Sequence, residues 1–152
     1  MPAPSGYSQH TSGFWYKNAD QSGPYTFDGT NMVLSFPSGV TTYSSGNVAN
    51  ATAAATIPAV AAKMNYLTGF EITSGGATAA GLVSATITGL AGGTATYTYG
   101  CVAGATAPNA PLSVTFDIPL PASAVNTAIV VTLPALGAGN TNATVVAHGY
   151  AV

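Results

Sequence analysis

The chain has 152 residues, of which 4% are charged: two are Lys or Arg, four are Asp or Glu, and the formal net charge is −2. An ordinary soluble domain has about 25% charged residues. Two lysines cannot form the basic cluster that a nucleic-acid backbone or an anionic membrane surface requires, so we expect neither kind of partner. A surface made of Thr, Ser, Asn, Gly and Ala instead suits a protein that is held against neighbours in a large assembly.

Residues 1–50 differ in composition from the rest, and we predict an aromatic-rich N-terminal arm or small subdomain with short strands such as Asn31–Phe36. They hold eight of the 14 aromatic residues, and Gly, Ser, Asn and Pro interrupt them every few positions. Aromatic side chains dominate the hot spots of protein interfaces. The cluster Phe14-Trp15-Tyr16 also fits a core segment or a ligand platform. The candidate interface anchors are Tyr7, Phe14, Trp15, Tyr16, Tyr25 and Phe27.

Residues 51–152 form a second segment, which we predict to be a β-sandwich (jelly-roll) domain. Thr, Val, Ile and Tyr are abundant there and favour the half-buried surface of a sheet. Gly and Pro separate the runs at intervals typical of a sandwich or jelly roll. We expect strands near Ala55–Val60, Asn65–Thr73, Leu82–Gly89, Thr94–Cys101, Leu112–Asp117, Ala128–Leu133 and Thr144–Tyr150.

The whole chain is therefore predicted to be all-β: an antiparallel β-sandwich or jelly roll of about eight strands with an irregular N-terminal arm. Alternation is clearest where Thr94, Thr96 and Thr98 share one face of a strand. Helix is nearly absent from the prediction: Pro58–Met64 and Ala79–Ser84 could each form a turn of helix. Neither has a cap followed by a sustained apolar pattern with a period of 3.6 residues.

The residues that usually carry chemistry are scarce, and we expect no catalytic, cofactor-binding or metal-binding residues. His10, His148 and the single Cys101 are the only nitrogen and sulfur ligands of the kind that zinc prefers. We expect Cys101 to be a small residue in a strand. No Gly-x-Ser-x-Gly turn presents a serine nucleophile, and two of the four carboxylates, Asp20 and Asp28, lie in a turn-rich region. The sequence therefore predicts a protein that is not an enzyme.

Several stretches of the last hundred residues resemble small structural proteins of tailed bacteriophages. They are Thr56–Thr73 (TIPAVAAKMNYLTGFEIT), Ser84–Leu90 (SATITGL), Gly93–Tyr99 (GTATYTY), and the tail from Pro119–Ala124 through Gly137–Tyr150. In size and composition the chain is most similar to the jelly-roll decoration, or cement, proteins on the outside of phage capsids. The likeness lies in style and strand layout and includes no catalytic motif.

The resemblance implies a homodimer or homotrimer that binds the major capsid protein and bridges neighbouring capsomers on the outer surface of the virion. The N-terminus has neither the basic region nor the apolar run of a signal peptide, so we expect synthesis in the bacterial host cytoplasm without export by the usual route. Three alternatives remain open at this point: a head-fibre or tail component, a carbohydrate-binding surface module, and an enzyme.

Overall fold

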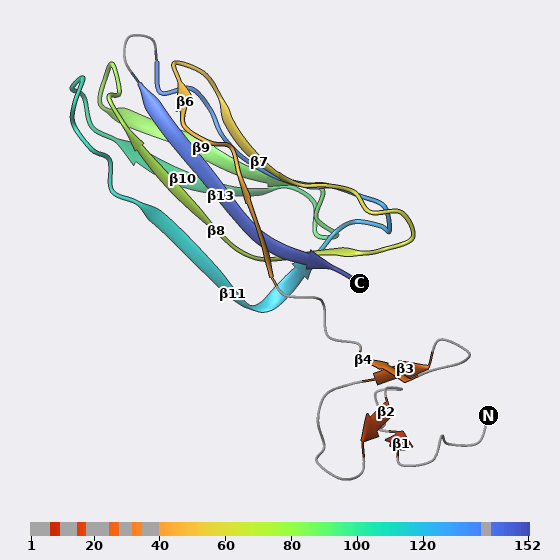
Figure 1. The fold of residues 1–152 in the computed structure, drawn as a ribbon. Coiled ribbons are helices and arrows are strands. Elements are labelled where there is room, and N and C mark those ends of the chain that lie inside the picture. The colour runs from red at the N-terminus through yellow and green to blue at the C-terminus, as the bar shows by residue number, and fades with distance from the viewer. Residues whose placement is uncertain (1–6, 10–14, 18–24, 28–31, 35–39, 138–140) are drawn as a thin grey trace. The chain divides into compact units, whose positions relative to one another are not determined.

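The chain divides into two compact units, Met1–Gly39 and Val40–Val152. The structure, a computed structural model, describes residues 7–9, 15–17, 25–27, 32–34, 40–137 and 141–152 (Figure 1). Composition predicts a boundary near residue 50, whereas residues 41–44 and 48–49 pair with the last strand of the second unit. Residues 40–50, which the composition assigns to the arm, therefore belong to the sandwich unit.

The described residues of the first unit form one four-stranded antiparallel sheet, in the order β1-β2-β3-β4. The strands are three residues long and follow one another in the sheet as they do in the chain. The predicted strand Asn31–Phe36 contains the last of them. Their bounds are β1 Tyr7–Gln9, β2 Trp15–Lys17, β3 Tyr25–Phe27 and β4 Met32–Leu34.

The second unit is an antiparallel sandwich of two sheets, which confirms the predicted fold class (Figure 1). One sheet has the order β11-β8-β13-β5, with the short β6 also paired to β13; we call it sheet B. The other has the order β10-β9-β12-β7; we call it sheet C. The bounds are β5 Thr41–Ser44, β6 Val48–Ala49, β7 Ala53–Ile57, β8 Asn65–Gly75, β9 Gly81–Thr88, β10 Ala95–Cys101, β11 Leu112–Pro121, β12 Ile129–Leu133 and β13 Asn142–Ala151.

The pairing pattern of this sandwich is that of a jelly roll. Leaving aside β6, the first strand pairs with the last (β5 with β13), the second with the seventh (β7 with β12), the third with the sixth (β8 with β11), and the fourth with the fifth (β9 with β10). A long double ribbon wound in this way gives two sheets that face each other. The jelly roll is one of the antiparallel architectures that limit exposed sheet edges.

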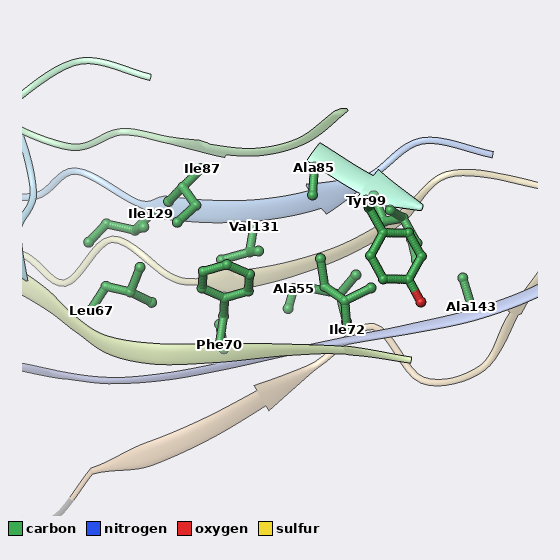
Figure 2. Packing of buried hydrophobic residues seen from close by; sticks show 14 of the residues in the cluster. Ala55, Leu67, Phe70, Ile72, Ala85, Ile87, Tyr99, Ile129, Val131 and Ala143 are labelled. Carbon is green, nitrogen blue, oxygen red and sulfur yellow. The ribbon is translucent and has the colours of Figure 1, made fainter. Parts of the chain in front are cut away.

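The core lies between the two sheets and is built from the side chains of each strand that point toward the facing sheet. Leu67, Phe70 and Ile72 of β8 point toward Ile129 and Val131 of β12 in Figure 2. Alanines fill much of the remaining space and let the sheets approach closely. The buried alanines are Ala53, Ala55, Ala77, Ala85, Ala122, Ala143 and Ala147.

Candidate interaction surfaces

The sequence-predicted anchors lie on the strands of the N-terminal sheet, apart from Phe14, which is outside the described residues. Tyr7 is in β1, Trp15 and Tyr16 are in β2, and Tyr25 and Phe27 are in β3. The register pairs Trp15 with Gln9 on one side and with Tyr25 on the other. The backbone thus gathers five of the six anchors into one small sheet.

The charged residues of the sandwich are few and lie on separate elements. Lys63 is in the loop between β7 and β8, Glu71 is exposed on β8, and Asp117 is exposed on β11. Within the described ranges, no group of three or more His, Cys, Asp or Glu residues is placed to hold a metal ion. His10, Asp20 and Asp28 lie outside those ranges.

Cys101 is the buried last residue of β10, as expected for a small strand residue. Burial raises the pKa of its thiol, so the protonated form is favoured. His148 lies on β13 between β8 and β5, and its Nδ1 is 3.2 Å from Oγ1 of Thr42. A protonated thiol is a poor nucleophile, so the buried Cys101 is not activated for attack.

The outer surface of sheet C is the most distinctive surface of the sandwich. Its side chains are mostly hydroxyl-bearing or small, and none is charged or aromatic. The register aligns Thr96, Thr86 and Thr132 in one row across three strands. We call this surface the threonine face; it comprises Ala54, Thr56, Leu82, Ser84, Thr86, Thr88, Thr96, Thr98, Gly100, Val130 and Thr132.

The outer surface of sheet B has a different chemistry. The rings of Tyr66 and Tyr150, which are partners in the register of β8 and β13, stack with centroids 5.3 Å apart and planes inclined by 16°. Burial, and secondarily the neighbouring Tyr66, raise the pKa of Tyr150. Farther along the same strands, Thr73 and Thr144 line a shallow pocket of about 220 Å³.

The edge of sheet C at β10 is held firmly by contacts with sheet B. The ring of Tyr97 packs on Phe70, and the hydroxyl of Tyr99 lies 2.9 Å from Oγ of Ser74. Asn109 donates from Nδ2 to the same Oγ, and its Oδ1 accepts a hydrogen bond from the backbone N–H of Val102 at 2.7 Å. These contacts hold the inner face and the end of the strand against sheet B.

An apolar pocket of about 240 Å³ borders the start of this edge strand. Leu90, Leu120 and Pro121 form its apolar wall, and Thr94 and Ala95 line the side of the pocket next to β10. Gly92 and Gly93 of the β9–β10 turn also line it, and a Cβ on either would meet no atom within 4 Å. The pocket is therefore open above the turn.

Neither a protein-family model nor a curated protein matches the chain. Among the described residues, no helix is long and apolar enough to cross a membrane. The functional conclusion therefore rests on the fold and on the chemistry of these surfaces. Sequence reasoning missed the threonine face because its members are spread over four strands whose order the sequence does not reveal.

Proposed function

We propose that this chain is a non-enzymatic virion structural protein: a decoration, or cement, protein that binds the outer surface of a phage capsid and stabilises it by bridging capsomers. The threonine face is the observation that carries the proposal. A wide surface without charges can lie against another protein without burying an unpaired ion, which is costly. The cores of protein interfaces are likewise depleted of charged residues.

The proposed mechanism is preferential binding to the assembled shell. A protein that contacts two capsomers at once stabilises the assembled state over free subunits by mass action. Each contact can be modest, because linked contacts act at a high effective concentration. The partners under this proposal are the major capsid protein and further copies of the chain itself, as a homodimer or homotrimer.

The N-terminal sheet supplies the second contact in this proposal. Its strands carry Trp15, Tyr16 and Tyr25, which are residue types enriched in binding hot spots. The proposed role of this sheet is to grip the capsid or a sister subunit. A double variant of the full-length chain, with Trp15 and Tyr16 both replaced by Ala, tests this role. It is expected to weaken shell binding at least about tenfold, because each lost hot-spot residue costs about 2 kcal/mol or more.

Copy number in the particle is the first test of the proposal. Mass spectrometry of purified phage particles is expected to find this chain at an abundance comparable to that of the major shell protein. A few copies per particle would instead indicate a head-fibre or tail component. Absence from the particle would overturn the structural assignment.

A matched pair of variants tests the threonine face directly. Thr88 and Thr115 are both exposed, but Thr88 lies on the threonine face and Thr115 lies on β11 of sheet B. Thr88→Arg is expected to abolish binding to shells that lack the protein, and Thr115→Arg is expected to leave binding unchanged. Co-sedimentation with shells measures both, and equal binding by the two variants would remove the threonine face from the proposal.

A carbohydrate-binding surface module is the second candidate, and the stacked pair Tyr66–Tyr150 favours it. Aromatic rings with an apolar body and a polar tip suit contacts at wet surfaces. Saccharide binding on a glycan array that is lost in Tyr150→Ala would support this candidate. Shell binding that persists in the same variant would show that the two activities are separate.

A further inference from the structure

The edge strand β10 lacks the usual protection against pairing with another strand. It has seven residues, none charged and none proline, and its register with β9 is unbroken. In the described part of the chain it pairs with β9 alone. Natural edge strands are commonly blunted by charges, prolines, bulges or short length.

The three other edges of the sandwich each carry such a device. β11 contains Asp117, Pro119 and a register shift between Thr115 and Leu120. β5 has four residues and is separated from β6 by a break at residues 45–47. β7 has five residues and ends directly before Pro58. The contrast singles out β10 as an edge left open.

We infer that two copies of this chain pair antiparallel through β10, with the two-fold axis at Thr98, and so join their two copies of sheet C into one continuous sheet. The inference deepens the self-association part of the proposed function and rests on it only for its biological setting. Such an interface is isologous, because the same strand is used on both sides. The absence of charge on β10 means that no like charges face each other across the axis.

The chemistry of the strand fits this register. Tyr97 then lies opposite Tyr99 of the partner subunit, and Thr98 lies opposite its own copy. Aromatic and Thr–Thr cross-strand pairs are both favourable. Because Tyr97 and Tyr99 are already fixed on sheet B, little side-chain freedom is left to lose on pairing.

The same register also brings an apolar residue of the partner subunit to the rim of the apolar pocket. It places Val102 of the partner subunit opposite Thr94, at the rim of the pocket that Leu90 and Leu120 line. Val102 is 49% exposed, and its backbone is held by Asn109. Two-fold symmetry makes the exchange reciprocal, so each copy offers one valine and receives one. A register shifted by one residue at the axis would place a glycine, Gly100 or Gly104, opposite Thr94.

A pair of lysine variants tests the edge. Thr98 and Ser84 are register partners, both are exposed, and both lie on the threonine face, but only Thr98 is on the edge strand. Sedimentation equilibrium of the purified full-length protein is expected to show a dimer for the unaltered chain and for Ser84→Lys. Thr98→Lys is expected to be monomeric, since two ammonium groups would oppose each other at the axis. A monomeric unaltered chain, or a dimer or trimer that Thr98→Lys leaves unchanged, would overturn the inference.

A second pair of variants tests the pocket and the register. Val102→Asp is expected to weaken the dimer about tenfold or more, because a buried apolar contact is replaced by a carboxylate. Val125→Asp, at a residue that is 57% exposed in the β11–β12 loop, is expected to leave the dimer unchanged. Equal weakening by both variants, or by neither, would contradict the exchange.

Cross-linking gives a readout that does not depend on affinity. In a Cys101→Ser background, Thr98→Cys is expected to form an intermolecular disulfide on mild oxidation, and Ser84→Cys is not. Equal cross-linking of the two variants would reject the register. All of these experiments use the isolated protein, so a dimer that fails to bind shells would refute the proposed function alone. Shell binding by a chain that is monomeric would refute the β10 interface alone.

Discussion

The ring of Phe70 on β8 meets the ring of Tyr97 on β10 edge to face, with centroids 5.0 Å apart and planes inclined by 67°. Phe70 is 1% exposed, whereas Tyr97 is half-buried at the margin of the core. The contact therefore fastens the edge strand of sheet C to an interior strand of sheet B. It explains how a strand with one free side can remain in place.

This contact predicts a measurable coupling between the two residues. Phe70→Ala is expected to lower the free energy of unfolding by about 3–5 kcal/mol, because it removes a fully buried ring. A double-mutant cycle with Tyr97→Ala is expected to give a coupling energy of about 0.5–1.5 kcal/mol by urea unfolding. The same cycle with Tyr150→Ala, on the outer surface of sheet B, serves as the control and is expected to be additive. Additivity for Tyr97 would contradict the coupling.

Gly89 and Gly93 have nearly the same backbone φ angle, but we expect them to differ in how well they tolerate substitution by alanine. Their φ values are +85° and +87°, so alanine is strained at both positions. A Cβ at Gly89 would collide with the backbone carbonyl oxygen of Ala128, whereas a Cβ at Gly93 would meet no atom within 4 Å. We expect Gly93→Ala to cost about 1–2 kcal/mol and Gly89→Ala to cost about 1–3 kcal/mol more. Equal losses in thermal unfolding would show that the collision is relieved at little cost.

The surroundings of Asn65 predict that the stability of the variant Asn65→Asp will depend on pH. Its buried Nδ2 donates 2.8 Å hydrogen bonds to the carbonyl oxygens of Pro58 and Thr127. In Asn65→Asp a carboxylate would face two carbonyl oxygens, so the pKa of the new side chain would be raised in the folded state.

The sign of the effect follows from linkage. The folded variant binds a proton that the unfolded chain releases near pH 3.9, so its stability is greatest below about pH 4 and falls as the pH rises through the folded-state pKa. Urea unfolding at pH 3.5 and pH 7 measures the difference, with Asn126→Asp at an exposed turn as the matched control. An equal pH response in the two variants would contradict the prediction.

The burial of Cys101 predicts that the free energy of unfolding will fall in mild alkali. Burial raises the pKa of its thiol above the ordinary value of about 8.5 that the unfolded chain keeps. The folded state therefore binds more protons above that pH, and the free energy of unfolding falls as the pH rises from about 8.5 through the folded-state pKa. Urea unfolding under reducing conditions is expected to show a smaller decline for Cys101→Ala between pH 8 and pH 10. Parallel declines would assign the effect to other groups, of which buried Tyr99 is the nearest.

The strands of the sandwich could largely be predicted because alternation and turn residues are local signals. Two errors show where local signals fail. Thr41–Ser44 is a strand only because it pairs with β13, about a hundred residues later in the chain. β11 continues past Asp117 through Pro119 to Pro121, which the prolines argued against. An edge strand tolerates proline because its outward N–H groups need no partner.

The candidate surfaces could be predicted less well than the fold. The low charge was evident from composition, but which face lacked charge depended on the strand order. Thr86 and Thr132, for example, become neighbours only because β12 pairs with β9. The openness of β10 likewise follows from its place at the end of the order β10-β9-β12-β7.

The position of β13 has a consequence for how the protein is made. It is the last sandwich strand in the sequence, yet it lies between β8 and β5 at the centre of sheet B. On a ribosome, sheet B therefore cannot close until residue 151 has left the exit tunnel. Until then β5 and β8 have no neighbour between them, and the edges that β13 later covers are left without their partner strand. The strands of sheet C, β7, β9, β10 and β12, all precede β13 in the sequence, so sheet B is the later of the two sheets to be completed.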